Sequence, residues 1–390
     1  MTADPRIGGL DGIRGVCTLF VAYAHLGLWG CGWVAMECFF VLSGFLITRI
    51  LIQDRARAPN FGEYLKRFYV RRALRLFPVL YLYLTLVLLF SPLIPPEQNV
   101  AEQVPYAALY VFNLWILTDA HTGTPMLDHL WSLAVEEQFY LMWPLLLGLV
   151  PTRHIPKLLV SLLLLAPLTR WLVADYWPQS TKDGLIDNPY LATYFLTSSH
   201  LDAFAFGALL NFVRFNARGW HLLLALSATL AAGVLASGWG IRPYVPGGDL
   251  FNFGWPMSIP KNYQSVWGYS LIAFDCALLI AVASRPGLLQ RAMTWKPLVF
   301  MGERSYGFYV FHYAVMALFW PLREWIMDWS GSRSFAAAAI SPLYLMLIFF
   351  IAHLLHEYVE KPTFRLKNRF SFLAPASGAA ARVSKHDPLP

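Results

Sequence analysis

The chain has 390 residues, of which 57% are hydrophobic and only 14% charged, and its mean hydropathy is +0.49. This composition excludes a disordered chain and argues against an ordinary soluble globule, in which about 25% of residues are charged. The formal net charge of +7 would suit an acidic partner such as nucleic acid, so the position of the basic residues has to be considered.

Apolar segments of membrane-spanning length recur along the whole chain. We predict an all-α, polytopic membrane protein with about ten transmembrane helices, at residues 12–29, 33–52, 74–94, 131–150, 157–174, 191–213, 219–238, 265–283, 298–320 and 337–356. Residues 105–117 are also apolar, but about thirteen residues suit a re-entrant or interfacial helix better than a crossing. The membrane domain is expected over 9–366, and the polar segment 371–390 is predicted to be a disordered cytoplasmic tail.

The basic residues support ten crossings with both termini in the cytoplasm. With that topology most of the 30 lysines and arginines fall in cytoplasmic segments, and few, including Arg170 and Arg323, fall outside. A crossing at 105–117 would reverse every later loop and largely cancel this bias. The positive charge therefore reflects the topology of a multi-pass protein of the cell's inner membrane, and no nucleic-acid partner is expected.

The four cysteines have no metal-ligand spacing, so we expect no metal site and no redox role. Cys17 and Cys276 lie inside apolar segments and are expected to be small buried hydrophobic residues.

Ionisable residues within the predicted spans point to a functional site, because each is costly in a bilayer. Arg14 and His25 share one face of the first span, since eleven steps of 100° bring them to within about 20° of each other, roughly 16 Å apart along the axis. Glu37 lies at about the depth of His25, where a carboxylate would fix the tautomer of a general-base imidazole. The alternative is that Arg14 reaches the inner headgroups while His25 and Glu37 face the outer water. The spacing does not separate these interpretations.

Arg71, Arg72 and Arg75 lie at helical spacing in a basic amphipathic approach to the third span, FGEYLKRFYVRRALRLFP. Clustered arginines at a membrane surface bind either lipid headgroups or the phosphates of a soluble anion. Arginine chemistry alone does not distinguish the two.

Further polar residues are predicted inside the membrane. In HLWSLAVEEQFYLMWP, His129 lies at the outer end, and Glu136 and Glu137 lie about two turns in and point about 100° apart. Four more polar residues lie at middle depth: His200, Asp202, Arg304 and His312. A single buried histidine is more often structural than catalytic, but several polar residues at one depth favour a site.

Six motifs in order make the chain resemble the integral membrane proteins of acyltransferase family 3. They are LDGIRG with ten residues between Arg14 and His25, CFFVLSGFLIT, FYVRRALRLFP, HLWSLAVEEQFYLMWP, GERSYGFYVFH and YVEKP. The likeness extends from residue 9 to about residue 366. Members of this family are ten-span enzymes that transfer acyl groups, most often acetyl from acetyl-CoA, to sugar hydroxyls of surface glycans.

The resemblance implies that Arg14 and His25 are the essential pair, and that Arg71 and Arg72 contact CoA phosphates on the cytoplasmic side. It also implies that two residues of the SLxxExxFY motif belong to the site, Ser132 and Glu136.

Two positions depart from the family pattern. Glu37 stands where the family commonly has Asp, and His200 stands where it often has Arg. Any role of His200 therefore stays open.

Together these inferences predict a membrane O-acyltransferase that moves an acyl group, expected to be acetyl, from cytoplasmic acyl-CoA to a hydroxyl of a glycan or glycolipid. We expect no permanently bound cofactor. Arg71, Arg72 and Arg75 would hold the nucleotide end of CoA. His25, oriented by Glu37 or Glu136, would act as general base on the acceptor hydroxyl or carry the acyl group itself. Four residues are expected to support the substrates: Ser132, His129, His312 and Arg304.

A transporter or flippase with a proton relay inside the membrane is the alternative, because buried charges also mark such pathways. The sequence has no inverted repeat and no paired broken helices, which argues against it. The acceptor and the oligomeric state have no sequence signature.

Overall fold

The computed structural model describes residues 5–176, 189–213, 219–241 and 264–369. This part of the chain is helical and holds no β-strand, so the predicted all-α fold is confirmed. The tail predicted at 371–390 lies outside the described residues.

The helices of the first half correspond to the first four predicted spans and the segment between them. They are α1 (Pro5–His25), α2 (Val34–Arg57), α3 (Phe61–Leu89), η1 (Ser91–Leu93), η2 (Pro96–Gln98), α4 (Val100–Ala108), α5 (Phe112–Trp115), α6 (Pro125–Asp128) and α7 (Trp131–Leu149). The basic approach and the third predicted span form one continuous helix, α3. The apolar segment 105–117 is divided between α4 and α5 at Tyr110, which has a φ of 54°.

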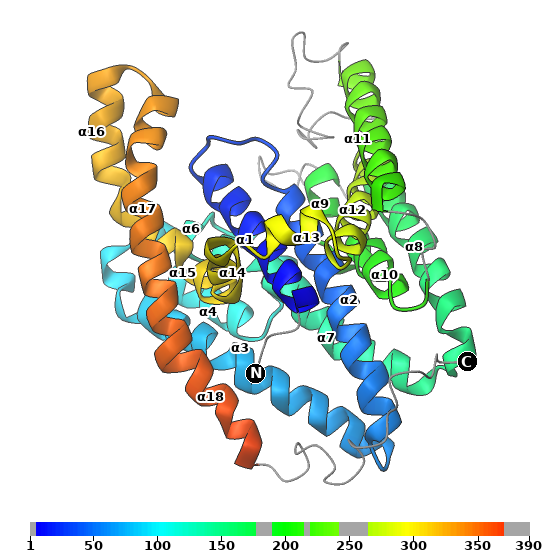
Figure 1. Cartoon of the computed structure of the whole chain (residues 1–390). Helices are drawn as coiled ribbons and strands as arrows, with labels where there is room; N and C mark the ends of the chain where they lie inside the picture. The colour runs from blue at the N-terminus through cyan, green and yellow to red at the C-terminus, as the bar shows by residue number, and fades with distance from the viewer. Residues whose placement is uncertain (1–4, 177–188, 214–218, 242–263, 370–390) are drawn as a thin grey trace.

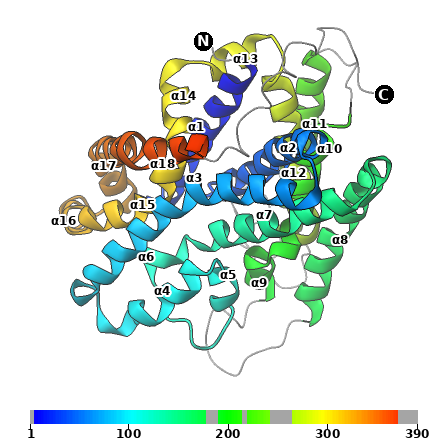
Figure 2. The same ribbon diagram turned by 90° about the horizontal axis from the view of Figure 1, so that it is seen from below.

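The second half contains more interruptions. Its helices are η3 (Thr152–His154), α8 (Ile155–Tyr176), α9 (Pro189–Phe195), η5 (Thr197–His200), α10 (Leu201–Leu209), α11 (Gly219–Ile241), α12 (Gln264–Ala283), α13 (Leu288–Met293), α14 (Lys296–Glu303), α15 (Ser305–Leu318), α16 (Trp320–Ser330), α17 (Arg333–Leu355), η7 (His356–Glu360), α18 (Lys361–Arg365) and η8 (Leu366–Arg369). In Figure 1, α16 and α17 stand at one edge, α8 and α11 at the other, and α1 and α2 between them. Figure 2 shows the same order from below.

Five helices in the described part are long and apolar enough to cross a membrane. They are α2, α3, α8 together with η3, α12, and α17 continued through η7 and α18. Two predicted spans are not single helices: 191–213 is broken at η5, and 298–320 is divided mainly between α14 and α15. Broken helices occur at membrane depth where protein surrounds the break, and Thr197, Ser199 and His200 of η5 are all buried.

Two glycines on either side of Arg14 bring α1 into backbone contact with the segment that joins α13 to α14. A Cβ atom at Gly12 would lie 1.8 Å from the carbonyl oxygen of Met293, and one at Gly15 would lie 2.2 Å from that of Leu298. Side chains do not fit at such distances, so only glycine allows this approach. The glycines of the LDGIRG motif are therefore explained by packing, and they fix the position of Arg14.

Arg170 does not lie in an outer segment, as the count of basic residues assumed. Its side chain is fully buried within α8, and its guanidinium donates to both carboxylate oxygens of Asp202, at 3.1 and 2.8 Å. It also donates to the carbonyl of Val266, at 2.9 Å from Nη2. This ion pair joins α8, α10 and α12, so Arg170 has a structural role.

Candidate active site

Two cavities of different chemistry lie within the bundle. The first, which we call the arginine cavity, has a volume of about 630 Å³ and is lined by residues that include Arg14, Ser43, Arg72, Arg75 and Glu136. The second, the histidine cavity, has a volume of about 450 Å³ and is lined by residues that include His25, His121, Asp128, His129 and Tyr313. Both volumes are in the range of small-molecule sites. Arg14 and His25, predicted to share a helical face, therefore reach different cavities, Arg14 from the middle of α1 and His25 from its last residue.

Met36 and Tyr309 line both cavities and form the wall between them. The hydroxyl of Tyr309 lies 2.6 Å from the carbonyl oxygen of His129 and 2.6 Å from the hydroxyl of Ser132. A tyrosine has one hydroxyl proton to donate. Because the carbonyl only accepts, Tyr309 donates to His129 and accepts from Ser132. Ser132, a predicted site residue, thus stabilises the position of Tyr309 in the wall through its hydrogen bond. Ser132 also lines the arginine cavity.

Glu136 belongs to the arginine cavity and does not contact His25. The hydroxyl of Ser43 donates to Glu136 Oε1 at 2.7 Å and accepts from the Tyr140 hydroxyl at 2.9 Å. The guanidinium carbon of Arg72 lies 4.0 Å from the centre of the Tyr140 ring, a cation–π contact. The carboxylate therefore lies within a group of cations and hydroxyls suited to a charged ligand.

The three clustered arginines divide into two kinds. Arg72 and Arg75 line the arginine cavity, whereas Arg71 forms an ion pair with Asp54 near the end of α2. Arg14, on the opposite wall, donates to Asp11 at 3.1 Å. Helical spacing alone did not reveal the pairing of Arg71, because Asp54 approaches from another helix. The prediction that Arg71 contacts an anion is therefore weaker than that for Arg72.

His25 is the last residue of α1 and bonds to a tyrosine. Its Nδ1 lies 2.8 Å from the hydroxyl of Tyr313 in α15, and the two rings are 4.6 Å apart. The ring of His312 lies 5.0 Å away. If Tyr313 accepts from Nδ1–H, Nε2 of His25 stays free to act as base or nucleophile.

His129 and His312 each form a hydrogen bond to a backbone carbonyl. His129 Nε2 donates to Val310 O at 3.1 Å, and His312 Nδ1 donates to Tyr309 O at 2.6 Å. Both rings also contact Tyr313, with centroids 5.2 and 4.8 Å away. These predicted supporting residues therefore lie beside His25, as the sequence suggested, and fix the local packing.

Glu37 does not orient His25. It lies on the first turn of α2, and its Oε1 is 2.7 Å from Nδ1 of His200, whose Nε2 donates to Tyr194 O at 2.8 Å. Both ring nitrogens of His200 thus face acceptors, so one proton is shared between the imidazole and the carboxyl group. The sequence analysis expected Glu37 near the depth of His25, but it did not give the direction in which the side chain points. The two departures from the family pattern are in direct contact.

Arg304 lies away from both cavities. It sits between α14 and α15, where its Nε donates to His353 Nδ1 at 3.1 Å and its Nη2 lies 3.5 Å from Glu357 Oε1. Its guanidinium also covers the ring of Phe300, 3.7 Å from the ring centre. The structure therefore gives Arg304 a role in docking α17, instead of the predicted contact with a substrate.

Tyr309, Tyr313, His121 and Asp128 were not selected by the sequence analysis. Tyrosine is common at membrane interfaces, so neither tyrosine stood out in SYGFYVFHY. His121 lies in the polar segment TDAHTGTP, outside every predicted span. The one sequence feature that could have drawn attention to Asp128 was its position next to His129, a predicted site residue. In the described part, no group of three or more His, Cys, Asp or Glu is placed to hold a metal ion.

This arrangement of helices and polar cavities agrees with comparisons to known proteins. The profile of acyltransferase family 3, described as an acyltransferase domain, matches residues 7–357. The chain belongs to this family, and the resemblance drawn from its motifs is confirmed.

Several bacterial relatives are similar over nearly the whole chain. The peptidoglycan O-acetyltransferase OatA of Listeria monocytogenes is 29% identical over 374 residues, which cover 91% of this chain and 55% of the relative. The O-acetyltransferase OatA of Staphylococcus aureus is 27% identical over 402 residues, 97% of this chain and 61% of the relative. The putative peptidoglycan O-acetyltransferase YrhL of Bacillus subtilis is 28% identical over 384 residues, which cover 91% of this chain and 54% of the relative.

The chain thus spans about half to three-fifths of the length of the curated relatives that it matches. No solved structure matches it.

Proposed function

We propose that the chain is a multi-pass enzyme of the cell's inner membrane that transfers an acetyl group from acetyl-CoA to a hydroxyl of a cell-wall glycan. The observation that carries the proposal is the pair of cavities on either side of the Met36 and Tyr309 wall. One is lined by cations and the other by imidazoles and tyrosines, as transfer from an anionic donor to a neutral sugar would require.

The arginine cavity suits the donor. Arg14, Arg72 and Arg75 present guanidinium groups to one space, and guanidinium groups bind phosphates through charge-assisted hydrogen bonds. The basic residues at the end of α2 and in the first half of α3 favour a cytoplasmic position for this end of the bundle under the positive-inside rule. The phosphates of CoA would then lie at this end, with the narrow pantetheine arm directed toward the wall.

The histidine cavity suits the reaction. With Tyr313 accepting the Nδ1 proton, His25 directs a free Nε2 at the acyl carbon or the acceptor hydroxyl. It then serves either as general base or as acyl carrier. The acceptor reaches this cavity from the outer side of the membrane. The names of the relatives suggest that it is peptidoglycan, whose muramic acid and glucosamine units offer free hydroxyls.

The test uses purified full-length protein in nanodiscs with labelled acetyl-CoA and an oligosaccharide prepared from peptidoglycan. The unmodified chain is expected to form the O-acetyl sugar, and His25→Ala to lower its rate by about 10²–10⁴-fold, the usual contribution of a general base. His154→Gln, an exposed histidine in η3, is the matched control and should retain full activity. If His25→Ala transfers acetyl normally, the proposed role of His25 is wrong. If the unmodified chain consumes no acetyl-CoA in nanodiscs but moves the sugar across the bilayer of sealed liposomes, the transporter alternative replaces the proposal.

A further inference from the structure

His121 and Asp128 form a second polar pair in the histidine cavity, on the segment between α5 and α7. Nε2 of His121 lies 3.0 Å from Oδ1 of Asp128, and both residues line the cavity that contains His25. The side chain of His121 is only 4% exposed, while that of Asp128 is 34% exposed. The imidazole is thus enclosed and its carboxylate partner stays partly hydrated.

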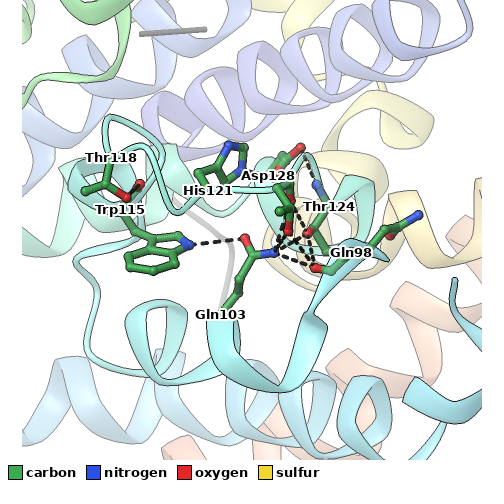
Figure 3. Close-up of polar contacts among 8 residues, drawn as sticks. Gln98, Gln103, Trp115, Thr118, His121, Thr124 and Asp128 are labelled. Carbon is green, nitrogen blue, oxygen red and sulfur yellow. Dashed lines mark hydrogen bonds and ion pairs between the residues drawn. The ribbon is translucent and has the colours of Figure 1, made fainter. Parts of the chain in front are cut away.

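The pair is held in place by a network of hydrogen bonds (Figure 3). The other carboxylate oxygen of Asp128 accepts from the backbone N–H of Thr124 at 3.0 Å. The Thr124 hydroxyl accepts from the amide of Gln103 at 2.6 Å, and the carbonyl oxygen of that amide accepts from the indole of Trp115 at 3.2 Å. Both carboxylate oxygens are therefore used, and Asp128 has one fixed orientation.

This fixed carboxylate determines which nitrogen of His121 is available. Nε2 is engaged by Asp128, so Nε2 carries the proton and Nδ1 is left as the basic nitrogen. In the described part of the chain no side chain or backbone group is recorded as a hydrogen-bond partner of Nδ1. An imidazole with one nitrogen on a fixed carboxylate is the arrangement of a general base, because the carboxylate stabilises the imidazolium that forms.

The other two histidines of the cavity lack this support. His25 bonds a neutral tyrosine hydroxyl and His129 a backbone carbonyl, as does His312 beside the cavity. We infer that His121, oriented by Asp128, is the general base that takes the proton of the acceptor hydroxyl, and that His25 deals with the acyl donor. The inference rests on the proposed function. It assigns deprotonation of the acceptor to His121 and reaction with the acyl donor to His25.

The proton and the electron pairs balance in the transfer step. The acceptor oxygen forms a bond to the acyl carbon, while that carbon's bond to its carrier breaks, whether the carrier is the sulfur of acetyl-CoA or a ring nitrogen of His25. The hydroxyl proton passes to Nδ1 of His121, and the carrier leaves with the bonding electron pair. In direct transfer, His121 then returns the proton through water to the sulfur, so that CoA leaves as the thiol. If His25 carries the acyl group on Nε2 and a proton on Nδ1, it leaves as the neutral imidazole without a further proton, and His121 returns its proton through water to the CoA thiolate released when His25 was acylated.

The experiment measures two rates on full-length protein in nanodiscs. One is the release of CoA thiol from acetyl-CoA without acceptor, and the other is O-acetylation of the peptidoglycan oligosaccharide. His121→Gln and Asp128→Asn are each expected to lower O-acetylation by about 10²–10⁴-fold and to lower the release of CoA by much less. His25→Ala should lower both rates. Thr118→Val, on the same segment and outside the pair, is the matched control.

The outcomes separate this inference from the function on which it rests. Normal O-acetylation by His121→Gln and Asp128→Asn would overturn the inference, whereas normal O-acetylation by His25→Ala would overturn the proposed role of His25. A parallel loss of both rates in the His121 and Asp128 variants would show that the pair is only structural. Added imidazole should restore O-acetylation to His121→Ala, and absence of rescue in a variant with unchanged thermal stability would also count against the base.

Discussion

The arginine cavity and the histidine cavity share a wall but differ in the chemistry of their linings. The first is lined by four arginines, Arg14, Arg49, Arg72 and Arg75, and by two carboxylates, Asp11 and Glu136, with the Tyr140 ring under Arg72. The second is lined by three histidines, three tyrosines and a single carboxylate, Asp128. Fixed charges bind anions, whereas imidazoles exchange protons near neutral pH. The chain therefore separates holding a charged donor from moving a proton, and variants on each side should change different kinetic constants.

Among the variants that test this separation, the largest effect on a KM is expected from Arg72→Gln. It removes a guanidinium from the arginine cavity, and hydrogen bonds to charged groups are worth about 1.5–3 kcal/mol, so the KM for acetyl-CoA should rise about ten- to a hundredfold. The KM for the glycan should not change. Arg71→Gln is the matched control, because Arg71 pairs with Asp54, and its KM for acetyl-CoA should change by less. Equal effects of the two variants would contradict the separation of these arginines.

Glu37→Asp tests a buried pair that lies in neither cavity. Shortening the side chain weakens its hydrogen bond to His200, which should lower stability by about 1–3 kcal/mol. Thermal unfolding in detergent would show a lower midpoint, while both KM values stay the same.

The double variant Glu37→Asp, His200→Arg should recover the lost stability. The longer arginine compensates for the shorter carboxylate and restores the combination that the family commonly has. Failure of the double variant to recover would mean that the two departures are not coupled, although they are in contact.

Tyr313→Phe is expected to lower kcat by about tenfold. It removes the hydroxyl that bonds His25 Nδ1 but keeps the ring that packs on His129, and a neutral hydrogen bond is worth about 0.5–1.5 kcal/mol. The KM for acetyl-CoA should stay the same, because the change lies in the histidine cavity. A rise in that KM without a fall in kcat would place Tyr313 in donor binding.

Tyr309→Phe, which changes a residue of the wall between the cavities, should have the smallest effect. The variant loses the hydrogen bonds to Ser132 and to His129 O but keeps the ring. Loosening of the wall should raise hydrolysis of acetyl-CoA without acceptor by about two- to fivefold, given the strength of neutral hydrogen bonds. The measurement is release of CoA thiol by variant and unmodified protein at equal concentration, and an unchanged rate would show that the wall does not limit access of water.

Much of the fold was predictable, because the length of an apolar segment by itself indicates whether the segment is a membrane-spanning helix. The positions of α2, α3, α8, α12 and α17 agree with predicted spans. The breaks at η5 and between α14 and α15 were not predictable, since each depends on a partner distant in sequence. His200 bonds Glu37 across 163 residues, and Arg304 bonds His353 across 49.

The site was predictable in its helical positions and not in its pairings. Helix geometry predicted Arg14 and His25 on one face of α1, and the arginine cavity meets this helix near its middle whereas the histidine cavity meets it at its end. Glu37 was expected at about the same membrane depth as His25. Periodicity along one helix, however, does not fix the direction in which a side chain of another helix points. The same limit explains why Asp54 and Tyr313 were missed as the partners of Arg71 and His25.

The wall of Met36 and Tyr309 has a consequence for the speed of turnover. Of the residues that the structure describes, Met36 and Tyr309 are the two that line both cavities. Side chains change rotamer far faster than helices move against one another, which takes microseconds to milliseconds. On the proposed function, an acetyl group passes from one side to the other through a side-chain rearrangement within a static bundle. The enzyme then needs no alternation between inward-facing and outward-facing states.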